Sequence, residues 1–169
     1  KLQGDIAEVG VYRGKSAKRL ATAFPDKELH LFDTFEGFPN NKGKYDTDIS
    51  KELFHKGTFF SNFKKLKSLL SEYPNVFFHK GIFSDTCKEV SEKRFALVHL
   101  DFDMYEPTKH AIEFFYPRMN PGGVMIFHDY RFFAGIKKVI NEFFEDKKEV
   151  VFCWNENQGI AFITGVGEK

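Results

Sequence analysis

The feature that most constrains the fold is a repeated alternation of short apolar segments with segments of helical periodicity. The first apolar segment, DIAEVGV at residues 5–11, ends in Tyr-Arg-Gly, and an amphipathic segment at residues 16–24 follows it. The segment FALVHL at residues 95–100 is apolar almost throughout, which is typical of a strand buried on both faces of a parallel sheet. Alternation of this kind predicts an α/β fold with a mostly parallel sheet and helices on both of its faces.

The same patterns predict the other elements. Strands are expected at residues 28–32, 76–79, 124–127, 150–154 and 160–164, and helices at residues 59–73, 107–119 and 133–144. The last two strands are separated by a polar turn, so we expect them to close the sheet with an antiparallel edge. Residues 120–123 (NPGG) are expected to form a tight turn. The polar segment 36–58 is predicted to be a long excursion over a site.

Length and composition narrow the class of protein. The 169 residues fit a single domain over residues 1–169, and 25 basic against 24 acidic residues give a net charge of only +1. That balance argues against a nucleic-acid partner, and no apolar run approaches the length of a membrane helix. We find no secretory signal, and Cys87 and Cys153 have no metal-type spacing, which favours a reducing, cytoplasmic location.

Phenylalanine is unusually frequent, with 22 residues of this type. The favoured interpretation is a core packed from aromatic rings. The alternative is an exposed aromatic patch that binds a substrate or a second copy of the chain, as in a homodimer.

Acidic residues follow strand after strand. In open parallel sheets, ligands bind beyond the carboxyl ends of the strands, and carboxylates gathered there repel one another unless a cation or a polyhydroxylated ligand meets them. Asp101 and Asp103 follow the central strand, and His128 and Asp129 end its neighbour. Carboxylates with one imidazole suit a divalent metal. His128 is alternatively a general base, or it hydrogen-bonds a neighbouring backbone group.

The first two strands predict a cofactor site. Glu8 lies in an apolar strand, where an unpaired carboxylate is costly, so we expect it to receive a ligand's ammonium or hydroxyl. Only Gly10 and Gly14 of a glycine-rich dinucleotide fingerprint are present, which disfavours NAD. Asp33 ends the second strand at an offset typical of an acid that binds ribose hydroxyls. A turn or helix-capping role for Asp33 is the alternative.

Five segments carry a resemblance to a known family: AEVGVYRGKS (7–16), LFDTFEGFP (31–39), KGIFSDT (80–86), HLDFDMYEPT (99–108) and YPRMNPGGVMIFHDY (116–130). With these five segments in this order, the chain resembles the macrocin-O-methyltransferase (TylF-type) family of S-adenosylmethionine-dependent methyltransferases. The resemblance implies a Rossmann-like class I methyltransferase fold with a mostly parallel seven-stranded sheet and an antiparallel edge strand. It also implies methylation of a hydroxyl of a sugar or sugar-bearing natural product, with S-adenosylmethionine and a divalent metal, Mg²⁺ or Mn²⁺.

The resemblance also implies roles for individual residues. The cofactor-binding positions are Glu8, Gly10, Tyr12, Gly14, Asp33, Thr34, Gly81, Ile82, Phe83 and Asp101. Asp101 and Asp129 match the family's metal ligands, and the pattern at the strand ends adds His128 as an expected ligand. From their chemistry, the residues expected to take the proton are Asp101, Asp103 and His128. The family pattern has Asp-Asp-Tyr where this chain has His128-Asp129-Tyr130, and its N-terminal lid elements are not expected within this sequence.

Two rival functions remain open at this stage. Asp101-Phe-Asp103 looks like the motif of haloacid-dehalogenase-type phosphohydrolases, although Tyr105 and the position after the fourth strand do not fit that pattern. The other rival is a non-catalytic cofactor-binding subunit. Whether the protein is a methyltransferase or a cofactor-binding subunit, we expect four rings near the site to contact the substrate or the adenine: Phe35, Phe38, Phe83 and Phe102.

Overall fold

The computed structural model describes residues 2–38, 55–155 and 157–164. The strands are β1 (Asp5–Val9), β2 (Leu29–Asp33), β3 (Val76–Lys80), β4 (Phe95–Leu100), β5 (Met119–Phe127), β6 (Val151–Cys153) and β7 (Gly159–Phe162). The helices are α1 (Lys15–Ala23), α3 (Phe63–Leu69), α4 (Phe83–Thr86), α5 (Tyr105–Phe115) and α6 (Ala134–Phe144), with 3₁₀ turns at Cys87–Val90 and Tyr116–Arg118. No helix in these ranges is long and apolar enough to cross a membrane.

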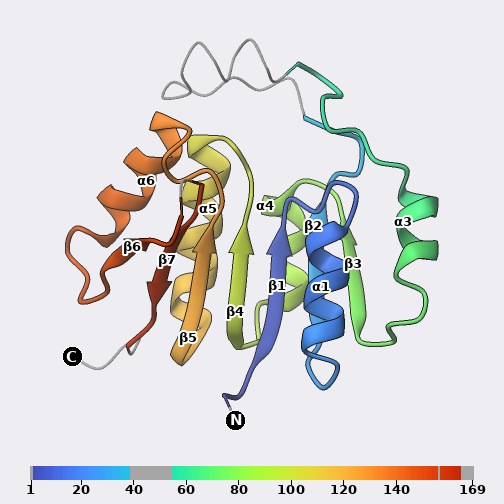
Figure 1. Cartoon of the computed structure of the whole chain (residues 1–169), viewed down its shortest axis with the longest axis horizontal. Helices are drawn as coiled ribbons and strands as arrows, with labels where there is room; N and C mark the ends of the chain where they lie inside the picture. Colours follow the sequence, from blue (N-terminus) through green and yellow to red (C-terminus); the bar gives the residue numbers. More distant parts are fainter. Residues whose placement is uncertain (1, 39–54, 156, 165–169) are drawn as a thin grey trace.

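The strands form one seven-stranded sheet in the order β3-β2-β1-β4-β5-β7-β6 (Figure 1). The neighbours from β3 to β5 are parallel, and β7 runs antiparallel to both β5 and the edge strand β6. The predicted α/β class, with a mostly parallel sheet and an antiparallel strand near its edge, is confirmed. The order of strands reverses between β1 and β4, so a ligand is expected beyond their carboxyl ends.

Helices cover both faces of the sheet because side chains alternate along each buried strand. Ala7 and Val9 of β1 pack in one cluster with buried residues of α5 and α6. Ile6, whose side chain points to the opposite face, packs in the other cluster with buried residues of α1 and α3. Both faces of β1 therefore pack against apolar side chains, and the one charged side chain buried within the strand is Glu8.

Aromatic rings form much of the larger cluster, as the phenylalanine content predicts. Phe115 of α5 lies edge-on against Phe95 of β4, with ring centroids 5.0 Å apart, and contacts Phe32 of β2 at 6.1 Å. All three rings are fully buried. Three rings of the predicted helices and strands lie outside the core: Phe60, Phe77 and Phe152 are 61%, 42% and 53% exposed, the last two on strands at opposite edges of the sheet.

The structure differs from the sequence prediction in three places. Residues 120–123 belong to β5 instead of a tight turn. The helix expected at residues 59–73 is shortened to α3, because Phe59 has a φ of +61° and the Asn62 side chain caps the helix by accepting a hydrogen bond from the Lys65 N–H. The short α4 was not predicted. Of the predicted excursion at residues 36–58, residues 39–54 lie outside the described part.

Candidate active site

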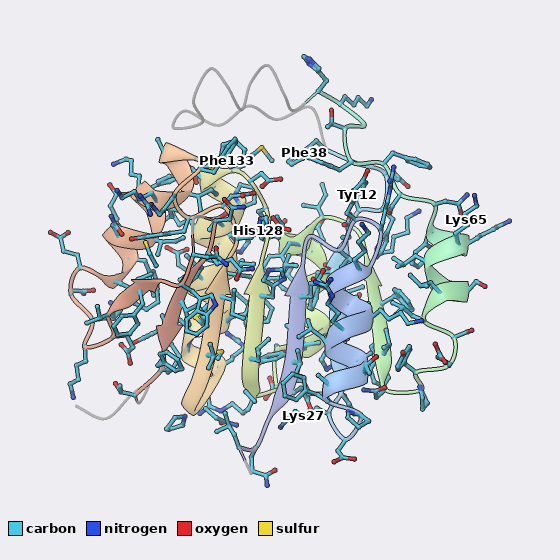
Figure 2. All side chains as sticks on the ribbon, viewed as in Figure 1. Tyr12, Lys27, Phe38, Lys65, His128 and Phe133 are labelled. Carbon is cyan, nitrogen blue, oxygen red and sulfur yellow. The ribbon has the colours of Figure 1, made fainter. Side chains whose placement is uncertain are left out.

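A cavity of about 780 Å³ lies beyond the carboxyl ends of the parallel strands, at the reversal of strand order. Figure 2 labels Tyr12, Phe38 and His128 at this end of the sheet. The predicted site residues that line the cavity are Gly10, Tyr12, Asp33, Thr34, Gly81, Ile82, Phe83, Asp101, Asp103, His128 and Asp129. Glu8 and Gly14 are not among the residues that line it.

Asp33 fixes the loop that follows β1. Its Oδ2 accepts hydrogen bonds from the backbone N–H groups of Val11 and Tyr12, each at 2.9 Å, and its Oδ1 accepts one from Phe35 N–H at 2.8 Å. Tyr12 has a φ of +48°, and these bonds hold it in that strained conformation. Asp33 therefore shapes the rim as well as facing the cavity, and the turn role weighed in the sequence analysis is present.

Gly10 permits a close approach between β1 and β4. Its φ is +84°, and a Cβ added there would lie 2.0 Å from the backbone oxygen of Asp101. Gly14 has a different task, because its Cβ would lie 2.3 Å from Cδ1 of Leu66 in α3. The position of Gly14 thus serves packing of α3 against the start of α1.

Glu8 lies beneath the cavity and pairs with a histidine of the neighbouring strand. It is fully buried, and its Oε1 accepts a hydrogen bond from Nδ1 of His99 at 3.1 Å. The second carboxylate oxygen is buried and makes no hydrogen bond with the described residues. The His99 ring meets the His128 ring edge to face, with centroids 6.0 Å apart. The group in contact with Glu8 is therefore His99, which supports the site from below.

Asp101, Asp103, His128 and Asp129 converge on one point at the cavity floor, and we call them the acidic cluster. Their potential ligand atoms all lie within 4.8 Å of one another. Nδ1 of His128 lies 2.9 Å from Oδ2 of Asp129 and 3.1 Å from Oδ1 of Asp101. Neither contact is aligned as a hydrogen bond, so both are ion-pair contacts. The convergence predicted from the strand ends is confirmed.

Two side chains of the acidic cluster have strongly shifted pKa values. Interactions with the carboxylates of Asp101 and Asp129 raise the pKa of His128 to about 10. Burial and the neighbouring charge of Asp101 raise the pKa of Asp103 to about 8. Asp103 and Asp129 also have left-handed backbones, with φ of +61° and +53°. Perturbed titration and backbone strain in one cleft are typical of functional sites.

The acidic cluster fits a divalent metal. In an octahedral site with metal–ligand distances near 2.1 Å, adjacent ligand atoms are about 3.0 Å apart. The 2.9 and 3.1 Å separations around His128 Nδ1 match this spacing. Two carboxylates and an imidazole form a donor set that suits Mn²⁺ better than Ca²⁺. The predicted ligand set of Asp101, His128 and Asp129 is thus sterically ready for a metal.

Aromatic rings form the cavity walls. Phe38, Phe83 and Phe102 line the cavity as expected, and Phe83 contacts Phe102 with ring centroids 5.7 Å apart. The expectation for Phe35 is wrong: it is buried, and its ring stacks on Phe63 of α3 at 4.5 Å. Phe35 lies only two residues after Asp33, so its position at a strand end could not show whether its ring lines the cavity or packs in the core.

Helix α5 contributes polar residues to the cavity that sequence reasoning missed. Glu106, Lys109, His110 and Glu113 all line the cavity. Their spacing of three, four and seven positions places them on one face of the helix. The available signal was that α5 begins soon after β4, which places its N-terminal end near the carboxyl ends of the strands. Phe59, also on the cavity wall, carried no such signal.

Comparison with known proteins gives consistent relatives. A tetracenomycin-related rhamnosyl 4'-O-methyltransferase from Streptomyces olivaceus is 32% identical over 138 residues, covering 75% of this chain and 53% of the relative. Mycinamicin III 3''-O-methyltransferase from Micromonospora griseorubida is 29% identical over 143 residues, covering 75% and 55%. The chain therefore spans about half the length of these curated relatives.

Solved structures agree on the fold. The O-methyltransferase NovP superposes with a TM-score of 0.84 at 21% identity, covering 97% of this chain and 73% of NovP. The calicheamicin methyltransferase CalS11 gives 0.82 at 20% identity, covering 95% and 72%. The family model of macrocin-O-methyltransferase (TylF) matches residues 1–151. The chain belongs to the macrocin-O-methyltransferase family.

Proposed function

We propose that this protein is an S-adenosylmethionine-dependent O-methyltransferase that acts, with a divalent metal, on a hydroxyl of a sugar or sugar-bearing natural product. The observation that carries the proposal is the acidic cluster on the floor of a large cavity at the reversal of strand order. The curated relatives support the same substrate class, since one methylates a rhamnosyl-tetracenomycin and another methylates mycinamicin III.

The methyl donor would bind along the ends of β1, β2 and β3. Asp33 Oδ2 already accepts from Val11 and Tyr12, but Oδ1 accepts only from Phe35 N–H and keeps a free lone pair that a ribose hydroxyl can reach. Ile82, Phe83 and Phe102 offer apolar surface for an adenine ring. The carboxylates beside Gly10 give the floor a negative charge that complements the donor's sulfonium.

The metal would be held by Asp101, His128 and Asp129. A bound divalent ion lowers the pKa of a hydroxyl and holds it for transfer. Asp103 is then the residue left to take the proton in its ionised form, which a pKa of about 8 makes available near neutral pH, since it lines the cavity beside the ligands and is not needed as a ligand itself. The walls formed by Phe38 and Phe102 would exclude water and orient the acceptor.

Binding of S-adenosylhomocysteine tests the cofactor half of the proposal. Isothermal titration calorimetry should give micromolar affinity for the wild type and a loss of at least roughly tenfold for Asp33→Asn, because one charged acceptor is removed. Asp146→Asn, a change of the same chemistry on the exposed surface, serves as the control and should bind normally. No heat from the wild type would refute the methyltransferase proposal. The phosphohydrolase rival predicts no such binding, and it does not suit a member of this family.

A further inference from the structure

We propose that Asp5, Glu28 and His30 form a second metal site, specific for a tetrahedral ion such as Zn²⁺, at the opposite end of the sheet from the cavity. Asp5 begins β1, Glu28 precedes β2, and His30 lies within β2. Figure 2 labels Lys27, the chain neighbour of Glu28, at the end of the sheet that is remote from His128. The proposed site is therefore separate from the acidic cluster and from the proposed methyl transfer.

A buried, unpartnered nitrogen points to this site. His30 is only 3% exposed, and its Nε2 makes no hydrogen bond with the described residues. That atom lies 3.4 Å from Oε2 of Glu28 and 3.6 Å from Oδ2 of Asp5. An orphaned polar atom of this kind costs free energy, so its persistence between two carboxylates calls for a ligand.

The hydrogen bonds behind His30 define which of its nitrogens is bare. The Glu89 carboxylate can only accept, so Nδ1 of His79 donates to it at 2.6 Å. In a neutral ring, Nε2 of His79 is then an acceptor, and Nδ1 of His30 donates to it at 3.1 Å. Burial and the neighbouring His79 lower the pKa of His30, which favours its neutral form. The lone pair of His30 Nε2 thus faces two carboxylates.

Three electron-rich atoms can share one point only around a cation. Lys93 supplies part of that charge from the open side: its Nζ lies 3.4 Å from Oδ2 of Asp5 and also pairs with Glu28. The Lys93 side chain is 39% exposed and rests on a flexible stem, so it can withdraw into solvent. A metal ion would take the place of the Lys93 ammonium. It would also bind the lone pair of His30 Nε2, with which the ammonium makes no hydrogen bond.

The spacing of the ligand atoms selects the ion. Tetrahedral Zn²⁺ with ligands at 2.0–2.2 Å separates them by about 3.4 Å, close to the 3.4 and 3.6 Å found around His30 Nε2. The acidic cluster, at 2.9 and 3.1 Å, has the tighter spacing of an octahedral ion. The chain from His30 through His79 to Glu89 also matches the outer-shell support that zinc-bound histidines usually have.

Cobalt absorption and zinc calorimetry test the site. Both are measured in an Asp101→Asn/Asp129→Asn background, so that the acidic cluster does not contribute. We expect one ion per chain, with the intense visible absorption of four-coordinate Co²⁺. His30→Gln should abolish binding. Lys93→Gln should raise affinity roughly fivefold, the effect of losing one competing exposed ion pair, whereas Lys147→Gln, which also removes one positive charge, should leave it unchanged.

Two results would overturn the inference: zinc affinity that survives His30→Gln, or an absorption spectrum of six-coordinate cobalt. If His30→Gln unfolds, Glu28→Gln replaces it, because Glu28 is half-exposed and its loss spares the core. Binding of S-adenosylhomocysteine should be unaffected by either variant. Failure of the zinc site and failure of the proposed methyltransferase function are therefore distinguishable.

Discussion

Replacing Gly10 by alanine should break the close contact between the ends of β1 and β4 on which the cavity floor rests. The new Cβ would lie 2.0 Å from the backbone oxygen of Asp101 and 2.8 Å from its carbonyl carbon. Both atoms belong to the backbone, which cannot rotate away as a side chain can. The β4 end must therefore move by about 1 Å, which would also strain the hydrogen bond from Asp101 N–H to the oxygen of Val9, now 2.9 Å long.

The expected loss of stability follows from three contributions. A left-handed backbone at a non-glycine residue costs about 1 kcal/mol, overpacking against a rigid neighbour costs about 2 kcal/mol, and weakening one backbone hydrogen bond costs about 1 kcal/mol. Gly10→Ala should thus lower the free energy of unfolding by about 4 kcal/mol, at the high end of what single substitutions do.

Gly122→Ala is the matched control. Gly122 has nearly the same φ, +83° against +84°, but the nearest atom to its added Cβ is Cδ1 of Leu2 at 3.6 Å, an ordinary contact. It should lose only the conformational contribution of about 1 kcal/mol. Urea denaturation of both variants measures the difference, expected to be about 3 kcal/mol. Equal destabilisation of the two variants would refute the claim that Gly10 is required by the contact with Asp101.

Three further predictions follow from other parts of the molecule. Mn²⁺ at a hundredfold excess over its Kd should raise the melting temperature of the wild type by roughly 5 °C, and Asp129→Asn, which tolerates the left-handed backbone, should remove that shift in differential scanning fluorimetry. Asn62→Ala should lower the free energy of unfolding by about 1 kcal/mol, measured in urea, because it removes the cap of α3; no loss would mean that the cap is not made in solution. Burial raises the pKa of Glu149, but hydrogen bonds from Thr164 and Tyr116 outweigh it and hold the pKa below its usual value. The stability from these bonds is therefore present above about pH 4.5 and is lost as the pH falls through the lowered pKa. Glu149→Gln should flatten that part of the pH dependence of urea stability, and an unchanged profile would contradict this.

The fold was largely predictable because its buried strands are short apolar runs bounded by polar residues. The bounds of β4 were predicted to the residue, since a continuous apolar run lies there between Arg94 and Asp101. The short α4 was not, because four residues are too few to show helical periodicity and its start depends on Gly81, whose φ of +152° suits few other residues. The expectations of a cytoplasmic location and of a homodimer stay predictions.

The part of the site that could be predicted is the part that strand direction determines, which is the set of residues at the carboxyl ends of the strands. Parallel strands end at one edge, so Asp101 and Asp129 had to lie near each other. What lies beneath that edge depends on register, which pairs Glu8 of β1 with His99 of β4. No sequence pattern fixes that register, and so a carboxylate expected to meet a ligand was found to meet a histidine.

The two histidine–carboxylate groups differ in how their charge is balanced, and this difference supports the functional assignment of the cavity. At the remote end of the sheet, Lys93 pairs with both Asp5 and Glu28. In the acidic cluster, within the described part of the chain, no lysine or arginine pairs with Asp101 or Asp129, whose recorded ion-pair partner is His128. A sequence with 25 basic residues had ample means to place one there. The three carboxylates at the cavity floor share His128 as their one recorded basic partner, which leaves an excess of acidic groups that costs stability, and a cation that enters with the ligand recovers that cost only when the site is in use.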